Sequence, residues 1–420
     1  MRVLAWFFVA VWVLAAAAVS AQPVRPGAPA AGLSPLSLQA AAFAKQAAAA
    51  NANGDADEAF RLSNEALALD AANREALAVK AGVLVNAGRM PEALDAYDAW
   101  QKAAGKDDPP TLALFGRGTL QALVTDADRA IGARALEALA RAGTPEARAA
   151  LGRLRASSDD PAASSAATEA LARLGDARAG RELLAAASAG SMARRFSAVQ
   201  AVGVARPAGA SKALVKLLGD PDPMIRSAVL DALASLGDTT IKPAVLQRLA
   251  DADRIVRLGA AATLNRLGDR SGEKLLSEAL NADLADLRLL AASGFKGSAN
   301  RTWVAAIRPI LADMNGRNRL IAADLLLPIE RAAALETIRA ALADENPWIR
   351  TTAAQMLVAD PSADTATLRT MLRDGSPWVR LFAAGRLATP QASQGRSAGR
   401  GTAAVPARTT SAASNNPARG

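Results

Sequence analysis

The sequence of 420 residues contains neither cysteine nor histidine. Without cysteine the chain forms no disulfide and has no thiol nucleophile. Without histidine it lacks the side chain most often used as a general base and as a metal ligand, which excludes zinc sites built from nitrogen and sulfur ligands. The sequence also has no glycine-rich phosphate-binding loop and no nucleophile elbow. We therefore expect no catalytic residues, no cofactor and no metal, and predict that the protein is not an enzyme.

Aromatic residues are also scarce, at 4% of the chain against 51% hydrophobic residues in total. Most of the apolar residues are alanine and leucine, which are strong helix formers. A β-sandwich would need more valine, tyrosine and phenylalanine. The composition therefore predicts an all-α protein with closely packed helices.

The body of the chain carries little net charge. The formal charge is +9, but six arginines lie in the two ends of the chain, which leaves +3 for residues 38–390; the six are Arg2, Arg25, Arg396, Arg400, Arg408 and Arg419. So small a net charge argues against a groove that binds nucleic acid. Residues 391–420 contain no acidic residue and are low in complexity, so we expect a disordered basic tail that offers weak, salt-sensitive binding to polyanions.

The first residues, "MRVLAWFFVAVWVLAAAAVSAQP", are typical of an export signal. One basic residue precedes an apolar run, and Val19 and Ala21 fit the small-residue cleavage rule. We expect a signal peptide over residues 1–21, a periplasmic or secreted protein, and no transmembrane span after cleavage. The alternative is an uncleaved anchor that tethers the protein to the inner membrane. Residues 22–37 are rich in proline, glycine and alanine and predict a flexible linker.

Two kinds of internal repeat follow the linker. Gly54 and Gly88 are 34 residues apart, and so are Ala59 and Ala93. A period of 34, with small residues at helix contacts and glycine in the turn, resembles the tetratricopeptide repeat (TPR). The resemblance covers two units, over residues 38–107.

The period then changes to 31. Arginines that open a helix recur at spacings of 31, with 30 for the last interval: Arg195, Arg226, Arg257, Arg288, Arg319, Arg350 and Arg380. An aspartate precedes five of them by six residues, at Asp220, Asp251, Asp313, Asp344 and Asp374. With two degenerate units before them, the repeats give about nine helix pairs over residues 108–390. This pattern resembles HEAT repeats of the short kind named after phycobiliprotein lyases, which implies a right-handed α-α superhelix, that is, a solenoid.

The heptapeptide "DENPWIR" (residues 344–350) and its near copy "DGSPWVR" (374–380) show what each unit repeats. The aspartate ends the turn between two helices, and the proline begins the second helix, where a missing N–H costs nothing. The family resemblance implies that arginine and aspartate of adjacent units form a ladder of ion pairs. An anion site at these arginines is the alternative that we consider weaker. Trp348 and Trp378 either pack on the neighbouring unit, which we favour, or serve as exposed anchors for a partner.

The residue after each ladder arginine is a leucine in four of six units: Leu258, Leu289, Leu320 and Leu381. On a HEAT-like unit this position tends toward the concave groove, where four leucines would form an apolar stripe for a partner. The alternative is that neighbouring helices bury these leucines.

These features predict a non-catalytic exported scaffold that binds proteins or peptides through a concave surface. The first alternative is an accessory subunit of an exported or envelope-associated enzyme complex. The second is polyanion binding through the basic tail. We expect no nucleic-acid partner for the body, and the sequence indicates no oligomeric state.

Overall fold

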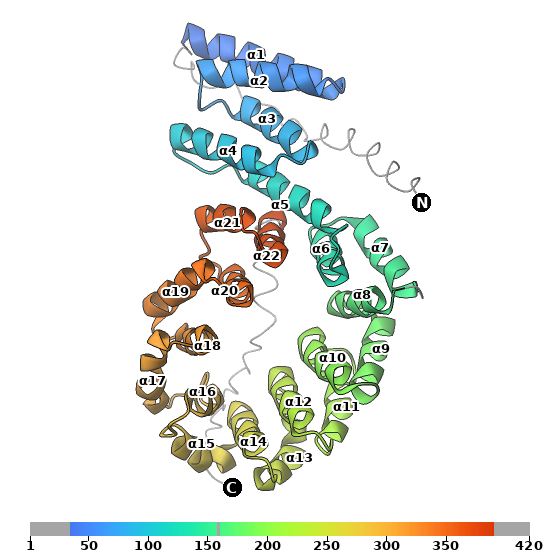
Figure 1. Ribbon diagram of the computed structural model, residues 1–420, viewed down its shortest axis with the longest axis vertical. Helices are drawn as coiled ribbons and strands as arrows, with labels where there is room; N and C mark the ends of the chain where they lie inside the picture. The colour runs from blue at the N-terminus through green and yellow to red at the C-terminus, as the bar shows by residue number, and fades with distance from the viewer. Residues whose placement is uncertain (1–33, 158–159, 390–420) are drawn as a thin grey trace, which may run out of the picture.

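The computed structural model describes residues 34–157 and 160–389. These residues form 22 α-helices and five short 3-10 helices, with no strand among them. The predicted fold class is confirmed: the chain is an all-α superhelix of stacked helices (Figure 1). The proposed signal peptide, most of the linker and the basic tail lie outside the described residues.

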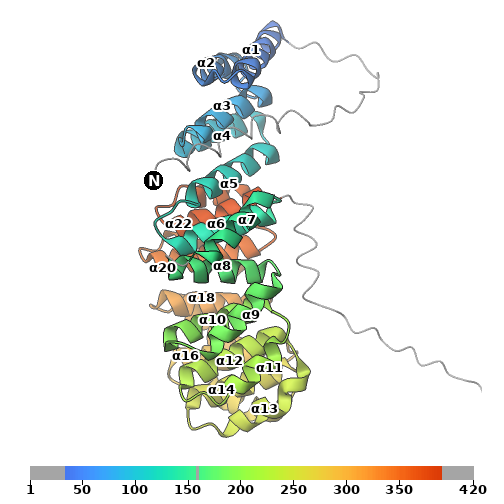
Figure 2. The same cartoon turned by 90° about the vertical axis from the view of Figure 1, so that its right-hand side faces the viewer.

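The first four helices form an arm that projects from the rest of the molecule (Figures 1 and 2). They are α1 (Pro35–Ala52), α2 (Ala56–Leu69), α3 (Arg74–Asn86) and α4 (Met90–Ala104). Helix α1 begins inside the segment predicted as a linker, so that boundary was wrong. The reason is a cap: the Ser34 hydroxyl accepts the Ser37 N–H at 3.1 Å, and Pro35 occupies the first turn, where its missing N–H is harmless.

The remaining eighteen helices form nine pairs arranged in two layers around a ring (Figure 1). The first helices of the pairs are α5 (Pro109–Leu123), α7 (Pro145–Ala156), α9 (Ala177–Ser188), α11 (Ala210–Leu217), α13 (Lys242–Leu246), α15 (Glu273–Ala279), α17 (Thr302–Ile307), α19 (Arg331–Ala340) and α21 (Thr365–Leu372). From α7 onward these helices form the outer layer.

The second helices form the inner layer. They are α6 (Arg129–Arg141), α8 (Pro161–Arg173), α10 (Met192–Ala205), α12 (Pro223–Leu236), α14 (Arg254–Arg266), α16 (Ala285–Gly294), α18 (Gly316–Leu326), α20 (Pro347–Ala359) and α22 (Pro377–Ala388). Five 3-10 helices extend the short outer helices: η1 (Thr239–Ile241), η2 (Gln247–Ala250), η3 (Arg270–Gly272), η4 (Arg308–Ala312) and η5 (Ala341–Ala343).

The superhelix closes on itself, which the sequence did not predict. The last helix, α22, packs against α5 and α6, the first pair of the array (Figure 1). The core is continuous across this junction, because Leu368, Val379 and Ala384 belong to the same buried cluster as Phe115 and Leu120. Beside it, Arg369 of α21 binds Asp98 of α4. We call the junction of α21 and α22 with α4, α5 and α6 the seam.

Candidate protein-binding rim

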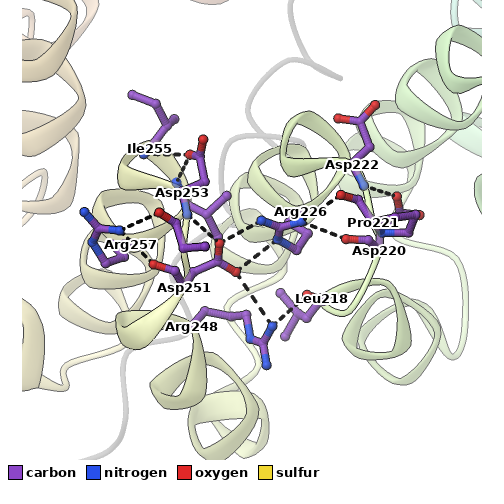
Figure 3. Close-up of polar contacts among 12 residues, drawn as sticks. Leu218, Asp220, Pro221, Asp222, Arg226, Arg248, Asp251, Asp253, Ile255 and Arg257 are labelled. Carbon is purple, nitrogen blue, oxygen red and sulfur yellow. Dashed lines mark hydrogen bonds and ion pairs between the residues drawn. The ribbon is translucent and has the colours of Figure 1, made fainter.

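Five of the turns between an outer and an inner helix are held by their own aspartate and arginine. Asp251 accepts the N–H of Asp253 through its carboxylate at 3.0 Å, and its backbone carbonyl accepts Arg257 Nη1 at 2.7 Å (Figure 3). Six arginines donate to the turn carbonyls six and five residues before them: Arg226, Arg257, Arg288, Arg319, Arg350 and Arg380. The repeated heptapeptide is therefore a self-contained turn in which the two ends of the motif bind each other.

Three of these six arginines also reach the aspartate of the next unit, and so does Arg195. Arg226 forms two bonds to Asp251, from Nη2 at 2.7 Å and from Nε at 3.0 Å (Figure 3). The other three pairs are Arg195 with Asp220, Arg319 with Asp344 at 3.1 Å, and Arg350 with Asp374 at 3.1 Å. A planar guanidinium fits a carboxylate with two parallel bonds, which suits it to this role.

The row of ion pairs is interrupted in the middle of the array. The carboxylate that Arg257 would need is missing, because Ala282 occupies that place in the next unit. Arg288 has Asp313 in register, yet its buried Nε has no hydrogen-bond partner among the described residues. Both arginines keep only their bonds to turn carbonyls.

The Asp251 carboxylate, 4% exposed, is held ionised. Burial alone raises the pKa of this carboxyl, but hydrogen bonds from Arg226 and from the Asp253 N–H outweigh burial and lower the pKa below its ordinary value. The pair is thus a structural contact whose parts satisfy each other.

Where the arginine register fails, a second network replaces it. Gly132 and Ser164 stand at the arginine position in α6 and α8. There Glu137, 4% exposed, accepts from Arg173 at 3.0 Å across the two helices. Arg134 and Arg141 bind the same carboxylate from its own helix at 3.0 and 2.7 Å. Charge pairing therefore joins these two inner helices as well, through residues that the repeat alignment did not single out.

The predicted leucine stripe is wrong. Leu258, Leu289 and Leu320 are 1%, 3% and 1% exposed and belong to one buried cluster, and Leu381 is 5% exposed. The inner helices pack directly on one another, as α14 does on α12 and α16, so the position after the arginine faces a neighbouring helix. These four leucines are core residues.

Exposed apolar side chains lie instead just before each arginine. Six consecutive units each place one at the start of the inner helix or in the turn before it: Met192 (42% exposed), Met224 (54%), Ile255 (41%), Leu284 (66%), Met314 (100%) and Trp348 (53%). Each stands two to five residues before a ladder arginine. They are six of the ten large hydrophobic residues that are exposed in the described chain. We call these six residues the apolar rim.

The apolar rim lies along one edge of the ring. The ion pair of Arg226 with Asp251 joins the first turn of α12 to the loop before α14, and Arg350 with Asp374 does the same for α20 and α22. Arg317 and Asp286 join the starts of α18 and α16 at 3.8 Å. Because these contacts link the beginnings of neighbouring inner helices, the apolar side chains beside them face the same edge.

The two repeated tryptophans differ. Trp348 is 53% exposed and belongs to the apolar rim, contrary to the packing that we favoured from the sequence. Trp378 is half-buried, and its ring packs near that of Phe382, with 6.4 Å between ring centres.

No group of three or more aspartate, glutamate, cysteine or histidine side chains among the described residues is placed to hold a metal ion. No helix in that part of the chain combines the length and hydrophobicity needed to cross a membrane.

Comparison with known proteins identifies the repeats. The sequence profile of HEAT repeats matches residues 117–203, 181–264 and 211–296. No curated protein matches the chain.

Three solved structures are similar in their helical arrangement. Human deoxyhypusine hydroxylase with glycerol has 22% identity and a TM-score of 0.32, over 58% of this chain and 96% of that one. The complex of CpcE and CpcF of phycocyanin lyase from Nostoc has 21% identity and a TM-score of 0.36, over 56% of this chain and 93% of that one. An engineered protein has 16% identity and a TM-score of 0.30, over 73% of this chain and 97% of that one. The chain contains HEAT-type repeats, over residues 117–296.

Proposed function

We propose that this protein is a non-catalytic, exported scaffold that binds a protein or peptide partner through the apolar rim. The observation that carries the proposal is the regular exposure of one large apolar side chain in each of six consecutive units. Single exposed hydrophobic residues are normal, but their recurrence at one place in six consecutive units favours an interaction surface. Methionine and tryptophan suit such a surface, since methionine adapts its shape and tryptophan is favoured at binding hot spots.

The arm supports the same function if its two helix pairs are TPR units, as we propose. Ala47, Ala59, Ala81 and Ala93 are fully buried, as the small positions of that repeat require. Gly54 and Gly88 have φ angles of 83° and 73° in the turns, a conformation that glycine adopts without strain. Both repeat types are structural units that present extended surfaces.

Export rests on the sequence of residues 1–21 and places the partner in the periplasm or outside the cell. The absence of cysteine is compatible with this location, because the fold needs no disulfide there. The alternative of an accessory subunit of an envelope enzyme complex would use the same apolar rim.

The experiment is a binding assay with three apolar rim residues changed to lysine, in Met224→Lys/Ile255→Lys/Trp348→Lys. A matched control changes three exposed apolar residues elsewhere, in Leu38→Lys/Val204→Lys/Leu246→Lys. Partners are captured from a periplasmic extract, purified, and titrated against each folded variant by calorimetry. The proposal predicts that the rim variant loses binding at least roughly tenfold while the control keeps it. Equal binding by both variants would contradict it.

A further inference from the structure

The seam differs from every other junction in the ring. Neighbouring units elsewhere are consecutive in the chain, whereas the seam joins residues more than 250 positions apart, as in the bonds of Arg369 to Asp98 and of Arg373 to Asp95. Among the described helices, the seam is thus the one junction of the ring at which the two neighbouring units are not consecutive in the chain.

Small residues make the helix contact at the seam. A Cβ placed on Gly116 of α5 would lie 2.6 Å from the backbone oxygen of Ala384 and 2.6 Å from the nitrogen of Ala388, both on α22. A Cβ on Gly385 would touch Ala138 of α6 at 3.6 Å. The backbones therefore approach closely at this point, beside the larger side chains of the core that the two ends share.

Charged side chains complete the seam beside that contact. Arg369 of α21, 7% exposed, donates from Nε to Asp98 at 2.7 Å and from Nη2 to the Gln101 side chain at 2.7 Å. Its guanidinium also lies over the Tyr97 ring, 5.0 Å from the ring centre. The remaining contacts are Arg373 to Asp95 and Asp98, both at 2.8 Å, and the Thr365 hydroxyl to Asp107.

Solvent exposure makes this charge cluster sensitive to salt. Asp95 is 75% exposed and Asp98 is 42% exposed, so salt screens their attraction to the arginines. Arg369 Nη1 makes no hydrogen bond and reaches Asp107 only as an ion pair at 3.5 Å. The charged contacts across the seam should therefore weaken as the salt concentration rises.

We propose that the seam is a gate: Arg369 and Arg373 latch α21 onto α4, and release of this latch opens the ring into a superhelix with two free ends. Opening gives a partner access to the inner layer of helices. In the closed ring, a partner reaches that layer only from the two edges. The inference concerns the conformation of the ring and holds whether or not the apolar rim binds a protein.

The experiment measures a distance across the seam in the full chain. Because the natural sequence has no cysteine, Lys102→Cys on α4 and Ala366→Cys on α21 create two unique, exposed labelling sites. Spin labels on them report the distance distribution as the salt concentration rises. A control pair, Ser235→Cys and Arg266→Cys, spans the inner helices α12 and α14, which are linked along the chain.

The latch is tested with Arg369→Gln/Arg373→Gln in the labelled chain. Its matched control, Arg178→Gln/Arg270→Gln, removes two arginines that bind only glutamates within their own units. We expect that the fraction of molecules with a long distance across the seam grows as the salt concentration rises. At low salt, this fraction should be at least roughly tenfold larger in the latch variant than in the labelled chain without it. The control variant and the α12–α14 pair stay unchanged.

A third variant, Gly116→Leu, inserts a side chain where the backbone of α22 lies and holds the ring open with the latch residues intact. Circular dichroism separates opening from unfolding, and the salt titration of the natural sequence decides the question if a variant unfolds. A single short distance at every salt concentration, in the natural sequence and in any folded latch variant, would show that the seam is a fixed interface and overturn the proposal.

Discussion

At the scale of single residues, the ionisation of Tyr97 is a probe of the seam, because Tyr97 is the only tyrosine in the chain. Its ring is buried, and its hydroxyl accepts the Asp108 N–H at 2.7 Å and donates to Asp107 at 3.2 Å. Burial raises the pKa of the Tyr97 phenol above its ordinary value of about 10, because the phenolate would lose its hydration there.

We predict that tyrosinate absorbance appears only above pH 10 in the folded protein. Since the folded state favours the neutral phenol, this group contributes stability that is fully present below about pH 10 and is lost as the pH rises through the folded-state pKa. An ultraviolet titration of the folded and urea-unfolded chain measures the difference. If the phenol of the folded protein titrates at its ordinary pKa, Tyr97 is not buried as the structure shows.

The same titration separates two effects of Arg369. The cation lies over the ring and lowers the Tyr97 pKa. If Arg369→Gln leaves the seam closed, loss of the cation raises the pKa of Tyr97 further. If the variant opens the seam, exposure to water lowers that pKa toward its ordinary value.

At the scale of the helical element, the arginine of the repeated turn makes two kinds of contact. It binds the carbonyls of its own turn, and in some units it also binds the aspartate of the next unit. Arg226 and Arg257 both donate to the carbonyls of their own turns, but only Arg226 also binds a carboxylate in the next unit. The interruption after Arg257 provides a natural comparison within one chain.

We predict that Arg226→Ala lowers the free energy of unfolding by about 2–4 kcal/mol, since it leaves the buried Asp251 carboxylate with only the more distant Arg248, at 3.7 Å. Arg257→Ala should cost only about 1 kcal/mol, because the carbonyls it leaves are at a surface turn. Urea unfolding at neutral pH compares the two. The Asp251 pKa is lowered by folding, so the extra cost of Arg226→Ala is present above pH 4 or so and is lost as the pH falls through the folded-state value. Equal costs at neutral pH would show that the ion pair adds no stability.

The periodic residues explain which elements were predictable. Arginine every 31 residues, with aspartate six before it, predicts helix pairs and turns because the turn is closed by local bonds between those two residues. The face of each inner helix was less predictable. The leucine after the arginine and the apolar residue before it both recur, and sequence alone does not tell which of them the neighbouring helix covers. Met224, Ile255 and Trp348 share one position in the alignment, two residues before the arginine, and that shared position was the available signal.

At the scale of the whole molecule, closure follows from rotations that add up over nine pairs. In an open solenoid each unit contacts only its neighbours, and the terminal units must protect their exposed faces with polar caps. Here α22 is covered by α5 and α6, so the two ends of the ring protect each other (Figure 1). A small change in rotation per unit would leave the ends apart, and no single residue in the sequence encodes that sum. Gly116 and Arg369 become meaningful only once the two ends meet.

Small-angle X-ray scattering of the full chain at low salt measures whether the ring is closed in solution. We predict a scattering curve that fits a closed ring with a projecting arm, and a larger maximum dimension for Gly116→Leu. A curve for the natural sequence that already matches the larger, open superhelix, and that Gly116→Leu leaves unchanged, would show that the ring does not close.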